Sequence, residues 1–258
     1  MKQATAASIL RAARADRRML EPFTDLHPDL DEAWGYDVQA LDRQRRVANG
    51  ERLIGAKLGL TSAAKQARMN LTTPVVGFLT DTMQVDPGTM TVTTQWIQPR
   101  IEPEIAFILG RTIDSPLTSS EAARTVDAAI VAAEIIDSRY TDFRFRAADV
   151  IADNTSAAGV LLGEPRHRLT DINDLALLGC QLQVDDDIVH SATGAAILGH
   201  PLRALEWLSR HVAQRGETIP AGSVVLAGAL TDAVPLTPGK RYTILIQDLG
   251  TITTNPDE

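Results

Sequence analysis

Hydrophobic residues in the first fifty positions recur at helical spacing. Ile9, Leu10 and Ala13 can share one face of a helix, and residues 31–48 repeat the same spacing. Asn49-Gly50 directly follows this second segment as a stop signal. The pattern predicts an N-terminal helical cap over residues 1–50.

The pattern changes to short apolar or alternating segments from residue 51 onward. Strands are predicted near 52–60, 101–109, 131–138, 158–163, 180–190, 223–230 and 241–253. Turn signals lie at Pro87-Gly88, Asp185-Asp186-Asp187, Pro220-Ala221-Gly222 and Pro238-Gly239. Two helices interrupt the strands: one begins with the capping box Thr118-x-x-Glu121, and the other runs from Pro201 to Gly216. Helices and strands do not alternate regularly, which predicts an α+β fold.

Neither a linker nor a repeat divides the 258 residues, so we expect one domain, 1–258, with a catalytic β-rich core at 51–258. With 44% hydrophobic and 22% charged residues, the composition excludes intrinsic disorder. The formal charge of −8 opposes nucleic-acid binding. No apolar run approaches the roughly 18 residues of a membrane helix, and no secretory segment is evident, so we expect a cytoplasmic protein.

Three glutamates are candidate metal ligands. On a strand over residues 101–107, Glu102 and Glu104 share one face, with Cα atoms about 6 to 7 Å apart. Pro103 cannot donate to a ladder, which predicts a sheet edge or a bulge there. Glu134 interrupts an apolar run, where an unpaired carboxylate would be costly. An all-oxygen set favours Mg²⁺ or Mn²⁺. The alternative is a solvated edge for the pair and a salt bridge from Glu134 to Arg139.

Lys57, Asp81 and His200 are further candidates for the chemistry. The strand pattern around Lys57 places it opposite the core face, between Gly55 and Gly59, where it is either a partner for a carboxylate or enolate or a surface lysine. Asp81 is either a turn residue or an acid/base group. His200 precedes Pro201 at the predicted start of a helix, as a capping residue or as a hydrogen-bond donor to a ligand.

Six segments in order carry a resemblance to a known family. They are Lys57-Leu58-Gly59-Leu60-Thr61-Ser62, Gly77-Phe78-Leu79-Thr80-Asp81, Ile101-Glu102-Pro103-Glu104-Ile105, Glu134-Ile135-Ile136-Asp137-Ser138-Arg139, Ala152-Asp153-Asn154-Thr155-Ser156 and Gly194-Ala195-Ala196-Ile197-Leu198-Gly199-His200-Pro201-Leu202. Together they resemble the 2-keto-4-pentenoate hydratase and 4-oxalocrotonate decarboxylase group of the fumarylacetoacetate hydrolase superfamily. The resemblance runs from about Trp34 to Thr253.

This resemblance implies a mixed β roll with flanking helices, and Mg²⁺ or Mn²⁺ held by Glu102, Glu104 and Glu134. It further implies Lys57, Asp81 and His200 as catalytic residues, and Arg139 and Ser156 as substrate-binding residues. The implied substrate is a small 2-oxo dicarboxylate. A homo-oligomer is expected, and association with a sister hydratase is possible in this group.

The implied reaction is a lyase step in aromatic catabolism. Leu198-Gly199-His200-Pro201 favours the decarboxylases over the hydratases of the group, so we expect decarboxylation of 2-oxohex-3-enedioate to 2-hydroxypenta-2,4-dienoate. The first alternative is hydration of the dienoate at the same metal. Two others are C–C bond hydrolysis of an acylpyruvate and a non-catalytic partner, the last of which predicts a damaged glutamate triad.

Overall fold

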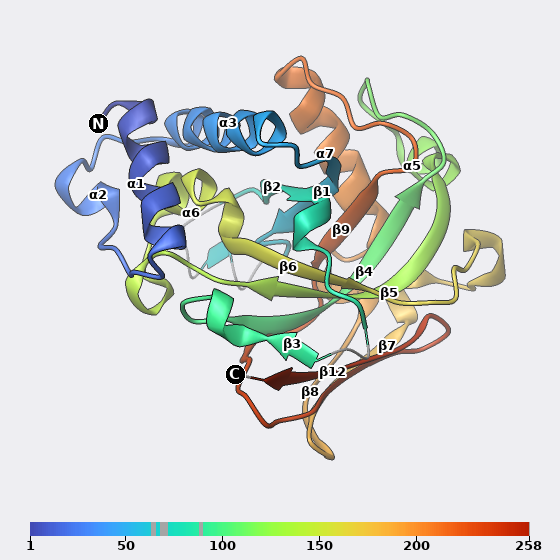
Figure 1. The fold of residues 1–258 in the computed structure, drawn as a ribbon. Coiled ribbons are helices and arrows are strands. Elements are labelled where there is room, and N and C mark those ends of the chain that lie inside the picture. The colour runs from blue at the N-terminus through green and yellow to red at the C-terminus, as the bar shows by residue number, and fades with distance from the viewer. Residues whose placement is uncertain (63–65, 68–71, 88–89, 258) are drawn as a thin grey trace.

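A curled β-sheet forms the centre of the protein (Figure 1). It is seen in a computed structural model that describes residues 1–62, 66–67, 72–87 and 90–257. The strand order is β2-β1-β9-β4-β5-β6, and β10 also pairs with β4. These strands are β1 (Leu53–Gly59), β2 (Val75–Thr80), β4 (Arg100–Leu109), β5 (Val126–Ile136), β6 (Ala157–Leu162), β9 (Val224–Ala229) and β10 (Val234–Pro235).

The two ends of this sheet approach each other. Just after β2, the Val85 N–H donates to the Val160 carbonyl of β6 at 2.9 Å, and Gln84 forms a bridge with Val160. The sheet therefore encloses an interior, and the predicted mixed β roll is confirmed.

A second sheet packs against the outside of the roll. Its order is β3-β12-β11-β7-β8, with β3 (Met90–Val92), β7 (Gly179–Val184), β8 (Asp187–Thr193), β11 (Tyr242–Ile246) and β12 (Gly250–Asp257). Ile105 and Phe107 of β4 pack with Leu182 and Ile244 of this sheet in the main core. Because side chains alternate along a strand, the even-numbered residues of β4 face the roll interior, so both Glu102 and Glu104 point inward.

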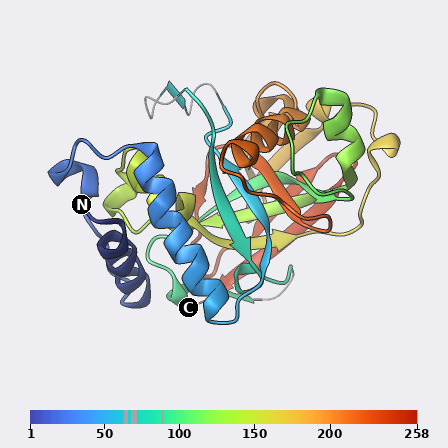
Figure 2. The same cartoon turned by 90° about the horizontal axis from the view of Figure 1, so that it is seen from above.

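Six helices surround the sheets in the described part of the chain. They are α1 (Gln3–Ala15), α2 (Phe23–Leu26), α3 (Glu32–Ala48), α5 (Ser119–Thr125), α6 (Ala147–Ala152) and α7 (Leu202–Gln214). From above, α1 and α3 lie along one flank (Figure 2). The Gln39 amide of α3 donates to the carbonyls of Val76 in β2 and Ile151 in α6, at 2.8 and 3.1 Å. These bonds fix α3 to β2 and to α6.

Most predicted elements are present, with shifted bounds. The capping box of Thr118 and Glu121 starts α5 as predicted. The segment 180–190 is two strands joined at the acidic turn, and 241–253 likewise divides into β11 and β12. The strand β2 was not among the predicted strands, because a short continuous apolar run has no alternation to mark it. Gly88, in one predicted turn, lies outside the described residues.

Pro103 does not mark a sheet edge, and that part of the prediction is wrong. Its strand, β4, is paired on both sides. On one side, β10 pairs with Arg100 and Ile101 of β4, and β9 pairs with β4 from Glu104 onward. Pro103 occupies the interval between these two partners, next to a register shift, so its missing N–H removes no bond from either ladder.

Candidate metal centre

Three carboxylates meet inside the roll because of strand register. Glu102 of β4 lies directly opposite Glu134 of β5 in the antiparallel ladder, and Glu104 is two residues further along β4. Each glutamate offers an oxygen, and these oxygens all lie within 4.8 Å of one another. Among the described residues, no other group of His, Cys, Asp or Glu side chains has a geometry that could hold a metal.

Burial makes the ionised form of these carboxylates costly. Glu104 and Glu134 are fully buried and Glu102 nearly so. Burial raises the pKa of Glu104 well above its usual value, and the nearby Glu134 and Glu102 raise it further. One oxygen of Glu104 accepts the Gly228 N–H at 2.7 Å, but its Oε1 has no hydrogen-bond partner. An oxygen-preferring divalent ion fits this donor set. It would balance the negative charge of the carboxylates and would give Glu104 Oε1 the partner that it lacks.

Lys57 is part of the same buried cluster. Its Nζ lies 3.0 Å from Glu134 Oε2 and donates to the Thr155 carbonyl at 3.1 Å. Burial alone would lower the pKa of Lys57, but the three glutamates outweigh it and leave the pKa raised. The surface-lysine alternative is therefore wrong. The alternative salt bridge from Glu134 to Arg139 is also not formed: among the described residues, Glu134 pairs with Lys57, and Arg139 with Asp153 and Asp137.

The glycines around Lys57 serve two different purposes. A Cβ on Gly55 would lie 1.8 Å from the Val224 carbonyl, so Gly55 lets β1 approach β9 rather than making room for a ligand. A Cβ on Gly59 would lie 3.7 Å from Lys57 Nζ. The same Cβ would lie 3.1 Å from Val75 Cγ2, so Gly59 keeps a side chain away from the lysine but does not leave open space there.

A strained turn supplies the carbonyl that binds Lys57. Asn154, Thr155 and Ser156 have φ values of 50°, 51° and 60°, a left-handed region that non-glycine residues seldom adopt. The Asn154 side chain holds this turn against β2, since it bonds both the N–H and the carbonyl of Phe78 at 2.9 Å. The next residue, Ser156, is buried and its Oγ has no hydrogen-bond partner.

A cavity of about 420 Å³ opens onto this cluster. Its charged lining residues are Lys57, Glu102, Asp232 and Arg100, the first residue of β4. Thr61, Thr155 and Ser156 are its other polar lining residues. Its apolar walls include Val75, Ile136, Phe143, Phe145 and Val150. A small polar molecule with a short carbon chain fits such a lining.

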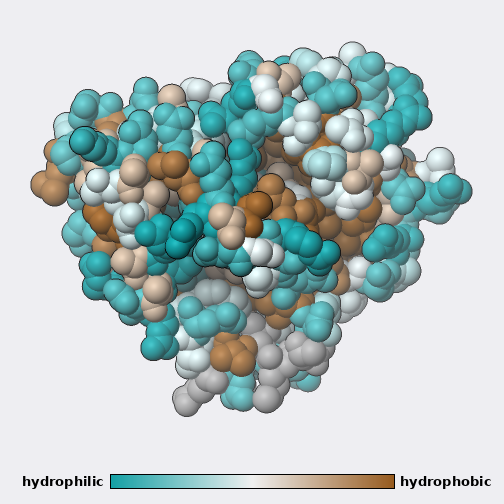
Figure 3. Space-filling view, turned by 45° about the horizontal axis from the view of Figure 1, so that its top comes forward, coloured by the Kyte–Doolittle hydropathy of each residue, from teal (hydrophilic) through white to brown (hydrophobic). Residues whose placement is uncertain are grey.

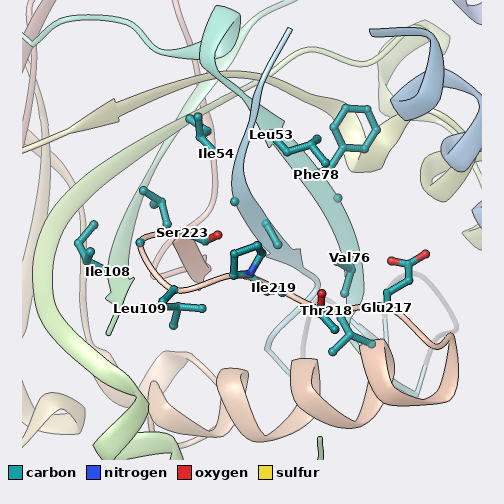
Figure 4. A pocket seen from close by; sticks show the side chains of 18 of the residues that line it. Leu53, Ile54, Val76, Phe78, Ile108, Leu109, Glu217, Thr218, Ile219 and Ser223 are labelled. Atoms are coloured by element: carbon teal, nitrogen blue, oxygen red, sulfur yellow. The ribbon is translucent and has the colours of Figure 1, made fainter. Parts of the chain in front are cut away.

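A larger hollow of about 890 Å³ lies elsewhere. Figure 3 shows hydrophobic side chains gathered in a hollow on the face where α3 and α7 lie in Figure 1. Figure 4 shows the larger cavity, whose labelled lining residues are Leu53, Ile54, Val76, Phe78, Ile108, Leu109, Glu217, Thr218, Ile219 and Ser223. None of the three clustered glutamates lines it, so we place the chemistry at the smaller cavity.

The comparison with protein families agrees with this geometry. Residues 51–255 match the family model described as fumarylacetoacetate (FAA) hydrolase C-terminal. The chain belongs to the fumarylacetoacetate hydrolase family. Within this family it falls in the group of 4-oxalocrotonate decarboxylases and 2-keto-4-pentenoate hydratases, and its relatives are lyases.

Two relatives and one solved structure define this group. A 4-oxalocrotonate decarboxylase of Pseudomonas sp. (strain CF600) is 37% identical, over 94% of this chain and 92% of that protein. A 2-keto-4-pentenoate hydratase of Dechloromonas aromatica is 36% identical, over 98% and 96%. The structure of 4-oxalocrotonate decarboxylase from Pseudomonas putida G7, complexed with magnesium and adipate, has a TM-score of 0.95 at 34% identity, over 98% of this chain and 97% of that chain.

Asp81, which the family resemblance places at the ligand, lies outside the cavity. It follows β2 at the end remote from Gly77, the residue that pairs with Lys57. Its carboxylate accepts the backbone N–H of Arg52 and forms an ion pair with that side chain at 2.9 Å. Hydrogen bonds from Arg52 lower the pKa of Asp81. This geometry matches the turn-residue alternative.

Arg139 is likewise not among the residues that line the cavity. It is fully buried, and both its backbone N–H and its Nη2 donate to Asp153 at 3.0 Å. Its side chain also pairs with the Asp153 carboxylate. Because Arg139 is paired with Asp153 and also with Asp137 at 3.8 Å, it has a structural role here, and the expected contact with substrate has no support in this geometry.

His200 sits at the start of α7, also outside the lining of the small cavity. Its Nδ1 accepts the N–H of Leu202, the first residue of α7, at 3.2 Å, although the N-cap residue itself is Pro201. Its Nε2 faces Asp174 at 3.5 Å. The structure therefore brings together the three glutamates, Lys57 and Ser156, but not Asp81, Arg139 or His200.

Arg100 and Asn154 are site residues that the sequence analysis did not single out. Arg100 had a usable signal, because it lies two residues before Glu102 and so shares its strand face. Asn154 lies in one of the segments that carry the family resemblance, but its contact with β2 depends on a turn that packs against a strand distant in sequence.

We expect metal binding to be visible in the stability of the protein. Mg²⁺ or Mn²⁺ should raise the melting temperature, and saturation at 100 times the dissociation constant corresponds to about 2.7 kcal/mol. Glu104→Gln should abolish this rise without lowering the melting temperature of the metal-free protein, because it removes a buried charge. Asp81→Asn is the matched control and should keep the rise. A response lost in Asp81→Asn but kept in Glu104→Gln would contradict the assignment.

The buried Arg139–Asp153 pair should contribute to folding. Asp153→Ala leaves the buried guanidinium with a single weaker partner, Asp137 at 3.8 Å, and should lower the free energy of unfolding by about 3 kcal/mol. The control is Arg144→Ala, which breaks exposed ion pairs with Glu21 and Asp25 and should change stability little. Denaturant titration measures both. Equal effects of the two substitutions would show that Arg139 is not a structural residue.

Proposed function

We propose that the protein is a metal-dependent decarboxylase that converts 2-oxohex-3-enedioate to 2-hydroxypenta-2,4-dienoate in the catabolism of aromatic compounds. The observation that carries the proposal is the buried triad of Glu102, Glu104 and Glu134 beside Lys57, open to a small cavity. Relatives named 4-oxalocrotonate decarboxylase, at 37 to 41% identity, support this choice of reaction.

The chain would hold Mg²⁺ or Mn²⁺ through its three glutamates. The chemistry that this ion supplies when bound is Lewis-acid polarisation of a 2-oxo acid. Loss of CO₂ from the far carboxylate sends an electron pair along the conjugated chain to the 2-oxygen. Lys57 places a fixed positive charge near that developing negative charge, and the Thr155 carbonyl holds its ammonium in position.

The remaining lining residues would orient the substrate and exclude water. Ser156 Oγ is buried without a partner and lines the cavity, so it can donate a hydrogen bond to a substrate carboxylate. Phe143, Phe145 and Val150 form apolar walls that offer no hydrogen bonds to a water molecule beside the carbon chain. Water exclusion favours decarboxylation over hydration of the dienoate product.

The second candidate is 2-keto-4-pentenoate hydratase activity. A hydratase relative is 36% identical over 98% of this chain, and the same triad serves a 2-hydroxydienoate equally well. His200 does not distinguish the two reactions by contact with the substrate, because it does not line the cavity. Its imidazole faces Asp174 and accepts the first N–H of α7. The intact triad argues against the non-catalytic partner.

Assembly and location remain part of the proposal. No helix in the described ranges is long and apolar enough to cross a membrane. We expect a cytoplasmic homo-oligomer, and a sister hydratase as an additional partner. Light scattering of the purified protein, alone and mixed with such a hydratase, tests self-association and association with the hydratase. A protein that stays monomeric in both measurements would refute these two expectations.

The assay that decides the function offers purified, Mg²⁺-loaded protein both substrates. We expect CO₂ release from 2-oxohex-3-enedioate at a kcat/KM at least tenfold above that for hydration of 2-hydroxypenta-2,4-dienoate. Lys57→Met should lower the decarboxylation kcat by roughly 10² to 10³, as loss of one preorganised donor does. Rapid hydration of the dienoate without CO₂ release from the enedioate would replace the proposal with the hydratase.

A further inference from the structure

Arg100 is a charged residue of the cavity to which the mechanism above gives no role. It is the first residue of β4 and lies on the same strand face as Glu102, with Cα atoms about 6 to 7 Å apart. It lines the same cavity as Lys57, Glu102 and Ser156. A guanidinium on this strand can therefore reach a ligand that is anchored at the glutamates.

The Arg100 side chain is held without an anionic partner. Its guanidinium carbon lies 4.2 Å from the ring centroid of Phe143, another residue of the cavity lining. This contact supports one face of the guanidinium and leaves its N–H edge available. Among the described residues, no carboxylate forms an ion pair with Arg100, whereas the buried Arg139 is paired with Asp153.

The cavity lining thus contains two cationic side chains, together with the carboxylates of Glu102 and Asp232 and several apolar residues. One cationic side chain is Lys57 at the glutamate triad, and the other is Arg100 on its aromatic support. Ile136 and Val150 are among the apolar residues that line the same space. An elongated molecule with an anionic group at each end and a short carbon chain between them matches this arrangement.

We propose that Arg100 binds the substrate carboxylate that is remote from the metal and so selects dicarboxylates over monocarboxylates. This inference rests on the proposed function, because that carboxylate is the one lost as CO₂. A guanidinium fork suits a carboxylate, since two parallel N–H groups can donate to its two oxygens. The charge on the departing carboxylate decreases in the transition state, so Arg100 should favour substrate binding rather than the chemical step.

The first test is a binding measurement. Calorimetry on Mg²⁺-loaded protein compares adipate with hexanoate, which has the same chain length and one carboxylate. Arg100→Gln should weaken adipate binding by roughly 10- to 100-fold, the range for a charge-assisted hydrogen bond, and leave hexanoate binding within about twofold. Arg111→Gln, an exposed arginine just beyond the same strand, removes an equal charge outside the cavity and should change neither affinity.

The second test is kinetic. Arg100→Gln should raise KM for 2-oxohex-3-enedioate by at least tenfold with kcat within about threefold, because the lost contact belongs to binding. Arg100→Lys keeps the charge without the fork and should give an intermediate KM. Thermal unfolding checks that each variant is folded.

The outcomes separate this inference from the proposed function. Equal losses for adipate and hexanoate, or no loss for either, would overturn the role of Arg100. A fall in kcat at unchanged KM would overturn it as well. If the protein releases no CO₂ from the enedioate, the proposed reaction fails, and the adipate and hexanoate titrations still decide whether Arg100 recognises a second carboxylate.

Discussion

The burial of three carboxylates beside one ammonium group is the constraint on which the site depends. Ionised carboxylates are costly inside a protein, and the fold places three of them within the roll, with Lys57 in contact with Glu134 at 3.0 Å. If all four groups are charged, two negative charges remain. A divalent cation balances this excess, and Glu104 Oε1 is available to it.

The surrounding structure holds these groups where they would otherwise repel one another. Strand pairing sets Glu102 opposite Glu134, and the Gly228 N–H fixes one oxygen of Glu104. The turn at 154–156 keeps three residues in a left-handed conformation, and Asn154 ties that turn to β2. Such strain is maintained only where neighbouring bonds determine the conformation, and here the turn supplies the carbonyl that orients Lys57.

Local patterns in the sequence predict the strand that carries Glu102 and Glu104 and the helix that the Thr118 capping box begins. They also predict that Glu134 needs a partner, because an isolated carboxylate in an apolar run is costly. They do not identify that partner. Lys57 reaches Glu134 across β9 and β4, and that contact depends on how the sheet curls, which a pattern with a period of two does not specify.

The same limit explains the residues that the structure separates from the site. Asp81, Arg139 and His200 lie in or beside motifs shared with the family, yet each has a nearby partner: Arg52, Asp153 and Asp174. A motif gives the residue type and its position along the chain, whereas the direction of a side chain depends on what packs against it. Arg100 shows the converse, because its strand position is predictable but the Phe143 ring beneath it is not.

Anomalous diffraction from crystals soaked in Mn²⁺ tests the central claim most directly. We predict one strong peak within the triad, with oxygens of Glu102, Glu104 and Glu134 at about 2.1 Å, as in other oxygen-ligated sites of small divalent ions. A Mn²⁺ ion bound elsewhere, with the triad empty and Lys57 still paired to Glu134, would contradict the account.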